Sequence, residues 1–205
     1  QDGHYNEETG IRTVVTALES GINLVDTSDN YINGRSEGIV GQALTHWCKQ
    51  GNRRDDLILS TKVSISELNP DAFSYDGTMR GIECSLKKLC TDYIDIYLAH
   101  DPTDISIVLD DQGCLGALRK LKEQGTIRAI GLGCRPHQFH RECIQTGEFD
   151  VSLTFGDYNL ADTSAFAGVI EPAATQNVGV FNASINSSLT ATANIERTRE
   201  LENWC

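Results

Sequence analysis

The sequence predicts an α/β fold, in which helices cover a parallel sheet that closes as an eight-stranded (β/α)8 barrel. The first observation is that short apolar runs alternate with helical patterns along the chain. The second is that Asp26, Lys62 and His100 each end one of three successive predicted strands, where barrel enzymes carry their active sites. The third is that no GxGxxG follows the first strand and no P-loop occurs, which weakens a doubly wound nucleotide-binding sheet.

The first half of the chain opens just before a helix and continues as strand–helix pairs. Residues 36–47 place apolar side chains on one helical stripe, with Ser36 as the expected N-cap. Runs rich in Ile, Leu and Val predict the strands. The further expected elements are strands at 22–26, 57–63 and 93–100 and a helix at 78–90.

The second half repeats this alternation. Gly125 is a stop signal for the helix before it, and a helix is expected across Pro172. The polar tail from residue 187 to 205 contains one further expected helix. The expected helices are 115–124, 137–146, 163–177 and 194–204, and the expected strands are 127–133, 151–155 and 178–184.

Length and composition predict one globular domain spanning residues 1–205. Hydrophobic residues make up 40% of the chain and charged residues 22%, and the formal net charge is −12. Nucleic acid and anionic membranes need a cationic surface, so neither is an expected partner. No apolar run approaches the ~20 residues of a membrane-spanning helix, and no signal peptide is recognisable. The chain lacks an initiator Met, so its start is expected to lie upstream.

The seven cysteines predict reduced thiols and a cytoplasmic location rather than a disulfide framework. Their number is odd, and no CxxC pair is present, so neither zinc nor another metal is expected. Two Asn-X-Ser patterns, beginning at Asn182 and Asn186, are interpreted as chance matches because no secretory signal accompanies them.

Four residues form a candidate proton-transfer site: Asp26, Tyr31, Lys62 and His100. A nearby ammonium favours phenolate and is expected to lower the pKa of Tyr31, while Asp26 holds that ammonium. His100 can bond a reacting oxygen, so the set suits interconversion of carbonyl and alcohol. Each residue alone has a more ordinary explanation, as a cap, a packed ring, a solvated lysine or a loop histidine. Their combination at neighbouring strand ends favours the catalytic interpretation.

Two groups of motifs resemble the aldo-keto reductase family. The first is Gly21-Ile-Asn-Leu-Val-Asp-Thr-Ser-Asp-Asn-Tyr31, followed by Gly34-Arg-Ser-Glu37 and Gly41-Gln-Ala-Leu44. The second is Ser60-Thr-Lys-Val63 together with Tyr93-Ile-Asp-Ile-Tyr-Leu-Ala-His100. The later stretch from Asp157 to Ser164 is similar to the sugar 1-dehydrogenase branch, which includes L-galactose, D-threo-aldose and D-arabinose dehydrogenases.

The resemblance implies a small-molecule carbonyl or sugar substrate and NADP or NAD as cofactor. It makes Tyr31 the general acid/base, with Lys62 lowering its pKa, Asp26 orienting Lys62 and His100 positioning the reacting oxygen. In the oxidative direction a cyclic aldose would lose hydride from C1 and give a lactone. The loops 64–77 and 103–113 are candidates for substrate contacts.

The sequence departs from the family pattern at several positions. Ile32 stands where many members have Gly, and residues 131–134 lack the usual Ser-Asn pair that binds the nicotinamide amide. The usual nicotinamide-stacking Tyr is replaced in the region of Asn182 and Ala183. Asn159 and Ser184 are the candidate cofactor contacts that remain.

The resemblance also implies that the first and eighth strands of the barrel are missing, which leaves six of eight. The absent end would carry the loops that bind the adenosine phosphate, so NADP and NAD are not distinguished. We expect residues 1–205 alone to associate through exposed strand edges and to bind cofactor weakly. Alternatives to a working enzyme are a non-catalytic binding or regulatory protein and an inactive truncated form. An unrelated barrel enzyme acting on phosphorylated substrates is disfavoured because no Gly-rich phosphate loop is found.

Overall fold

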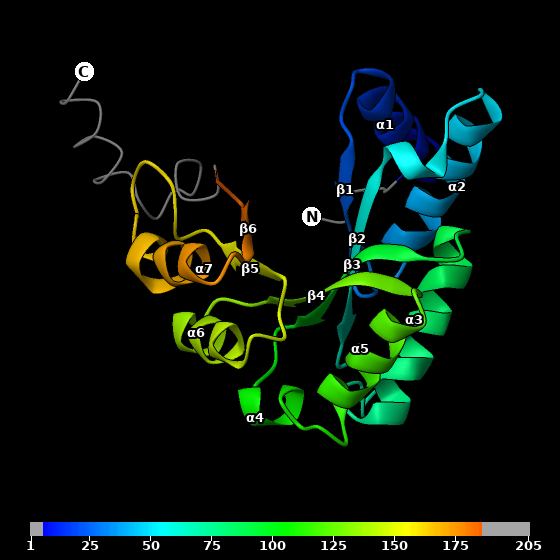
Figure 1. Cartoon of the computed structure of the whole chain (residues 1–205). Coiled ribbons are helices and arrows are strands. Elements are labelled where there is room, and N and C mark those ends of the chain that lie inside the picture. The colour runs from blue at the N-terminus through cyan, green and yellow to red at the C-terminus, as the bar shows by residue number, and fades with distance from the viewer. Residues whose placement is uncertain (1–5, 186–205) are drawn as a thin grey trace, which may run out of the picture. The chain divides into compact units, whose positions relative to one another are not determined.

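The computed structural model describes residues 6–185 and divides into two compact units, 1–130 and 131–205 (Figure 1). Strand β4 (Ile127–Gly133) runs from the first unit into the second. Along the sheet the strands follow chain order from β1 to β6. The parallel α/β pattern expected from the sequence is therefore confirmed, while the single-domain assignment stays a prediction.

In the first unit, three parallel strands are neighbours; β2 and β3 end opposite each other, whereas β1 ends earlier, opposite Ser60. Asp26 pairs with Ser60, and Ser64 pairs with His100. Helices α2, α3 and α5 lie along one side of these strands in Figure 1. The elements are α1 (Glu7–Glu19), β1 (Leu24–Asp26), α2 (Ser36–Lys49), η1 (Arg54–Asp56), β2 (Ile58–Ser64), α3 (Tyr75–Leu89), β3 (Ile94–His100), α4 (Ile105–Val108) and α5 (Cys114–Glu123).

The core of this unit lies between the helices and the strands. Trp47, Leu57, Tyr97 and Leu118 are buried in it. Helix α2 approaches α3 so closely that a Cβ on Gly41 would lie 2.1 Å from the backbone oxygen of Lys88. Only glycine fits there, which gives a packing reason for the Gly in the Gly41-Gln-Ala-Leu44 motif.

The second unit continues the alternation with shorter elements. Its strands β4, β5 and β6 are parallel neighbours, and Thr154 on β5 pairs with Asn182 on β6. The helix expected across Pro172 is a π-helical turn followed by a short α-helix. Pro172 lies in the first turn of that α-helix, a position that tolerates proline. The elements are α6 (His137–Thr146), β5 (Val151–Phe155), η2 (Phe166–Ile170), α7 (Glu171–Thr175) and β6 (Gly179–Ala183).

Several expected boundaries are wrong or fall outside the described residues. Ser36 is not the N-cap of α2: it is the first helical residue, and its hydroxyl bonds Thr27 Oγ1 at 2.8 Å. Helix α3 begins at Tyr75, earlier than expected, because Ser74 caps it by accepting from the Gly77 N–H at 2.9 Å. The expected helix at 194–204 lies outside the described residues.

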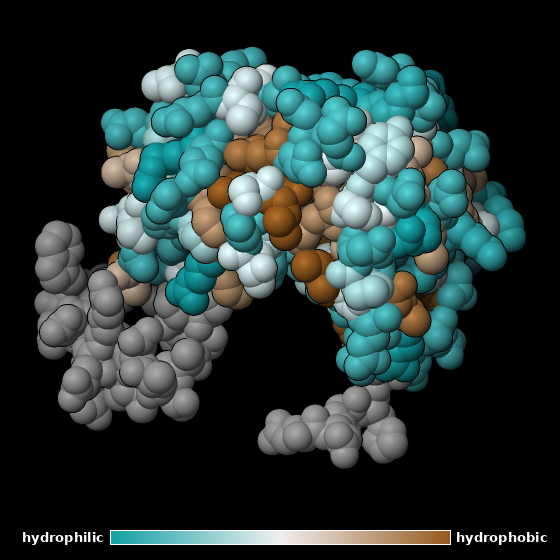
Figure 2. Space-filling view, turned by 90° about the horizontal axis from the view of Figure 1, so that it is seen from below, coloured by the Kyte–Doolittle hydropathy of each residue, from teal (hydrophilic) through white to brown (hydrophobic). Residues whose placement is uncertain are grey.

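The face shown in Figure 2 is mainly hydrophilic and carries apolar patches. Two exposed apolar side chains belong to strands: Ile58 of β2 is 41% exposed and Phe155 of β5 is 45% exposed. These are the kind of residues through which chains associate, so the expected association stays a prediction. Within residues 6–185, no helix is long and apolar enough to cross a membrane.

Candidate active site

The loop after β1 carries Tyr31 above the strand ends and holds it by backbone hydrogen bonds. The Tyr31 carbonyl accepts from the N–H groups of Gly34 and Ser36 at 3.1 and 3.2 Å. The chain turns back through Ile32, Asn33 and Gly34, whose φ values are 54°, 54° and 79°. A β-branched residue in the left-handed region is strained, so Ile32 occupies a position that favours the glycine of the family pattern.

Lys62 lies at the base of the site with its side chain fully buried. Its Nζ donates to Asp26 Oδ2 at 2.7 Å and to the Thr27 carbonyl at 2.6 Å. Ser60 donates to the other Asp26 oxygen at 2.8 Å. Burial lowers the pKa of Lys62, and Asp26 opposes that shift. The expected contact between Asp26 and Lys62 is therefore present.

The ring of Tyr31 lies beside both Lys62 and His100. Lys62 Nζ is 4.7 Å from the ring centroid, and the His100 ring meets it edge-on at 5.9 Å between centroids. Burial and the charges of Asp26, Asp101 and Asp29 raise the pKa of Tyr31 to about 12. The expectation that Lys62 lowers this pKa is wrong for this structure. Burial of the phenol is the largest cause of the raised pKa, and the three carboxylates add to it, while the ammonium of Lys62 bonds Asp26 and a carbonyl.

His100 lies at the end of β3 with hydroxyl groups around one ring nitrogen. Its Nδ1 is 2.9 Å from Ser64 Oγ and 3.4 Å from Ser28 Oγ. Its Nε2 is 3.6 Å from Asp101 Oδ2. Burial lowers the pKa of His100, and Lys62 adds to this, whereas Asp101 opposes it. Because burial is the largest of these effects, the neutral form of the His100 imidazole is favoured.

Asp29 and Ser64 are site residues that the sequence interpretation missed. Asp29 Oδ1 accepts from Ser64 Oγ at 2.6 Å, and Asp29 Oδ2 accepts from the Ser64 N–H at 3.0 Å. Asp29 lies inside the motif that ends at Tyr31, and Ser64 directly follows the motif that ends at Val63, so both residues could have been found from the sequence. Only the parallel register, which places Ser64 opposite His100, shows that they act together.

Glu37 is a second buried acid that the sequence interpretation did not single out. Its Oε1 accepts from Thr61 Oγ1 at 2.8 Å, and Lys88 Nζ is 3.5 Å from its Oε2. Burial raises the pKa of Glu37. Glu37 on α2 thus bonds Thr61 on β2, the residue before Lys62, and this hydrogen bond connects the helix to the strand beside the site.

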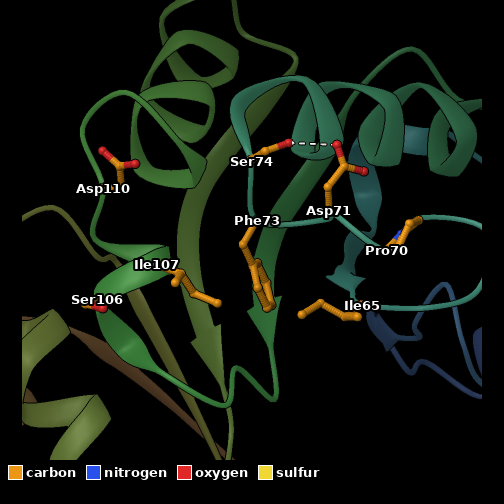
Figure 3. Close-up of a pocket in the computed structure, with 8 residues that line it drawn as sticks. All are labelled: Ile65, Pro70, Asp71, Phe73, Ser74, Ser106, Ile107 and Asp110. Carbon is orange, nitrogen blue, oxygen red and sulfur yellow. Dashed lines mark hydrogen bonds between the residues drawn. The ribbon is translucent and has the colours of Figure 1, made fainter.

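A groove of about 520 Å³ lies between the two loops expected to contact substrate (Figure 3). The side chains of Ile65, Phe73 and Ile107 point toward one another in it, and Asp71 and Asp110 lie on its margins. Ile65 directly follows Ser64, so the groove continues along the chain from a residue that contacts His100. Its mixed lining can take a molecule with both apolar and hydroxyl groups.

The candidate cofactor contacts lie in the second unit. Asn159 uses its side chain within its own loop: Oδ1 accepts from Ala161 and Asp162 N–H groups, and Nδ2 donates to the Gly156 carbonyl. Ser184 is exposed at a φ of 56° just after β6. Asn182 Oδ1 is buried with no hydrogen-bond partner among the described residues, although Nδ2 donates to Tyr158. The geometry thus favours Asn182 over Asn159.

Known proteins are similar to this chain in sequence and fold. The aldo/keto reductase family model matches residues 1–203. An aldo-keto reductase of Bacillus subtilis is 38% identical over 133 residues, covering 63% of this chain and 38% of the relative. L-Galactose dehydrogenase of Arabidopsis thaliana is 31% identical over 185 residues, and the alignment covers 89% of this chain and 56% of the relative. D-threo-Aldose 1-dehydrogenase of a Pseudomonas species is 27% identical over 210 residues, and the alignment covers 91% of this chain and 62% of the relative.

The solved structures agree with these relatives. The holo form of an aldo-keto reductase from Bacillus halodurans superposes with a TM-score of 0.72 at 29% identity, covering 86% of this chain and 57% of that one. The (β/α)8 barrel class expected from the sequence is thereby confirmed. The chain spans roughly 40–60% of the length of the curated relatives it matches. On the match across residues 1–203, this chain belongs to the aldo-keto reductase family.

Proposed function

We propose that this chain interconverts an alcohol and a carbonyl with NADP or NAD as cofactor. The observation that carries the proposal is the gathering of Asp26, Tyr31, Lys62 and His100 at the carboxyl ends of three neighbouring strands. When bound, the nicotinamide exchanges a hydride with the substrate carbon. The chain's own groups then manage the charge and the proton on the substrate oxygen.

In the reductive direction Tyr31 is the proton donor. Its pKa of about 12 keeps the phenol protonated at neutral pH, so it can donate to an oxygen that gains negative charge. Lys62 and Asp26 fix the positive charge beneath the ring at 4.7 Å from its centroid. His100 is the second group beside the ring and orients the oxygen.

For the substrate, we propose C1 of a cyclic aldose, which oxidation converts to a lactone. Two relatives carry the names L-galactose dehydrogenase and D-threo-aldose 1-dehydrogenase, and their alignments cover most of this chain. The groove beside Ser64 offers Ser74, Ser106 and the carboxylates of Asp71 and Asp110, all of which can bond sugar hydroxyls. Reduction of an aldehyde or ketone is the second candidate, and the protonated phenol of Tyr31 favours it.

For the cofactor, we propose Asn182 and Ser184 as contacts in the second unit. The orphaned Oδ1 of Asn182 is a buried acceptor, and a nicotinamide carboxamide carries an N–H of the kind it lacks. Asn159 is less suited because both of its side-chain ends already bond its own loop. A cytoplasmic location is part of the proposal, because the six described cysteines are thiols and not disulfides.

Tyr31→Phe tests the proposal against a non-catalytic binding role. Reduction of a carbonyl substrate should lose about 10²–10⁴ in kcat, the usual worth of a positioned proton donor. Tyr75→Phe, which alters an exposed phenol on α3, is the matched control and should leave turnover unchanged. Equal turnover in Tyr31→Phe and wild type, with the chemical step rate-limiting, would contradict the proposal.

A further inference from the structure

Three buried polar atoms without hydrogen-bond partners lie in the layer between the helices and the strands of the first unit. They are Glu37 Oε2 on α2, Ser85 Oγ on α3 and Tyr97 Oη on β3, and none has a partner among the described residues. The three residues are at most 1% exposed. A buried hydroxyl or carboxyl oxygen without a hydrogen bond has lost its solvation, so such groups normally have a partner. The three atoms therefore indicate a ligand within this layer.

The spacing along α3 places the three atoms close to one another. Gly81, Ser85 and Lys88 follow at intervals of four and three residues, so they share one face of the helix. A Cβ on Gly81 would lie 3.0 Å from Tyr97 Oη, and Lys88 Nζ lies 3.5 Å from Glu37 Oε2. Ser85 lies between these two contacts. Burial raises the pKa of Glu37 and of Tyr97, and the Ser85 hydroxyl opposes the rise in both, so it is near both groups.

The hydrogen-bonding capacity of the three atoms matches a water molecule. Ser85 and Tyr97 each offer one O–H, and Glu37 offers Oε2, because Thr61 Oγ1 already donates to its Oε1 at 2.8 Å. A water oxygen accepts from both hydroxyls while one of its hydrogens goes to Oε2. A protonated Glu37 donates to the same water instead, and the water then donates to Ser85. In both cases the water makes three hydrogen bonds, the usual number for a buried water.

The surroundings disfavour a metal cation and a larger molecule. The Lys88 ammonium, 3.5 Å from Glu37 Oε2, would repel a cation bound there. Within the part of the chain that the structure describes, no group of three or more His, Cys, Asp or Glu side chains could hold a metal ion. Because all three unpartnered atoms are buried, only a molecule as small as water can contact them together.

A pocket of about 220 Å³ beside α3 gives water a way to this layer. Gly81 and Lys88 line the pocket together with Asn69 from the loop before α3. Gly81 adjoins Tyr97 Oη, and Lys88 adjoins Glu37 Oε2, so both lining residues touch the unpartnered group. A Cβ on Gly81 would also lie 3.5 Å from Asn69 Nδ2 and would fill the space between the pocket and the Tyr97 hydroxyl. The glycine thus keeps this route open.

We propose that Glu37, Ser85 and Tyr97 form a binding site for one ordered water molecule, which joins α2, α3 and β3 and exchanges with solvent through the pocket beside Gly81. The bridge connects three elements whose side chains make no direct hydrogen bond to one another at this place. Tyr97 is the register partner of Thr61, the residue before Lys62, and successive residues of a strand face opposite sides. The water site therefore lies on the face of the sheet opposite Lys62, apart from the candidate active site.

Electron density tests the site without any variant. In a crystal structure of this chain, an isolated peak should lie about 2.5–3.0 Å from Glu37 Oε2, Ser85 Oγ and Tyr97 Oη. A structure in which Ser85 Oγ bonds Glu37 or Tyr97 directly, with no peak between them, overturns the inference. A metal cation at the position of the peak overturns it as well.

Water ¹⁷O relaxation in solution counts long-lived internal water molecules. The double variant Ser85→Ala/Tyr97→Phe leaves the water a single partner, so it should show one long-lived water fewer than wild type. The matched control is Thr78→Val/Tyr93→Phe, whose hydroxyls already donate to a backbone carbonyl and to a carboxylate. The control should keep the wild-type count. Equal counts in wild type and in the folded Ser85→Ala/Tyr97→Phe variant overturn the inference.

The two hydroxyls should also be coupled in urea denaturation. Because one water serves both, removal of the second hydroxyl matters less once the first is gone. The midpoint shift of Ser85→Ala/Tyr97→Phe should therefore be smaller than the sum of the two single shifts. The shifts of Thr78→Val and Tyr93→Phe, whose hydroxyls have separate partners, should add. Additive shifts for Ser85→Ala and Tyr97→Phe would show that the hydroxyls share no water and overturn the inference.

Discussion

The two ends of strands β2 and β3 use the same kinds of residue for opposite purposes. At the amino end, Asp95 accepts from Arg54 at 2.8 Å, from Arg128 at 2.8 Å and from the Leu59 N–H at 2.9 Å. The ring of Tyr93 lies between the two guanidinium groups, 4.3 and 4.2 Å from its centroid. Each charge there has an opposite partner, and cation–π contacts add to the pairing.

The carboxyl end holds groups that burial pushes away from their charged states. The pKa of Tyr31 is raised, and the pKa values of Lys62 and His100 are lowered. Ile32 and Asp101 occupy positive φ, at 54° and 47°. Perturbed ionisation and backbone strain together are typical of functional sites, whereas paired charges at the amino end of a barrel stabilise it. The difference predicts that mutations at the two ends have different effects.

The largest expected effect is at Lys62. Lys62→Met removes the charge beneath Tyr31 and should lower turnover by about 10²–10³, the scale of one preorganised electrostatic contact. Its unfolding free energy should change little, because a buried ammonium is lost together with its desolvation cost, and Asp26 is 25% exposed to water. Steady-state kinetics and urea denaturation check both parts, and Lys120→Met on the exposed face of α5 is the control.

The next largest effect is at Asp95. Asp95→Asn leaves Arg54 and Arg128 without their shared carboxylate and should cost about 2–4 kcal/mol of unfolding free energy. Turnover below the melting temperature should match wild type. Asp71→Asn, which breaks an exposed pair with Arg80, should cost far less in the same denaturation experiment.

The pH dependence of Tyr31 gives a smaller, spectroscopic effect. A phenol whose folded pKa is raised from 10.0 to about 12 adds stability below pH 10, and that stability is lost as the pH rises through about 12. In a phenolate absorbance titration of the folded protein, the difference between wild type and Tyr31→Phe should therefore appear near pH 12. A difference centred at or below pH 10 would show that Lys62 controls this phenol after all.

The smallest effect is at Ile32. Ile32→Gly removes a β-branched side chain from a φ of 54° and should raise the unfolding free energy by about 1 kcal/mol. Thermal unfolding measures this, with Ile39→Val in the core of α2 as a control that should destabilise. A loss of stability in Ile32→Gly would mean that the side chain packs well enough to offset its backbone strain.

The sequence predicted the parts of this molecule that depend on local pattern and on parallel register. Strand β4, helix α6 and strand β5 begin and end where expected. Asp26, Lys62 and His100 come together because parallel strands place their carboxyl ends at one edge. These inferences need only periodicity and the direction of the chain.

The features that the sequence did not predict depend on contacts between residues far apart in the chain, and the periodicity of the sequence does not reveal such contacts. Ser36 fails as a cap because Thr27, nine positions earlier, bonds its hydroxyl. The direction of the Tyr31 pKa was missed because the fold buries the phenol and places three carboxylates near it, while Lys62 bonds Asp26 and Thr27. The contact between Ser64 and His100 is visible only in the register of β2 with β3.

A paired measurement on Lys62→Met and Asp95→Asn tests most directly whether chemistry and stability are divided between the two ends. Turnover and unfolding free energy are measured on the same preparations of each variant and of wild type. We predict that Lys62→Met loses about 10²–10³ in turnover with little change in stability, and that Asp95→Asn loses about 2–4 kcal/mol of unfolding free energy with unchanged turnover. Full turnover in Lys62→Met, or a loss of turnover in folded Asp95→Asn, would contradict it.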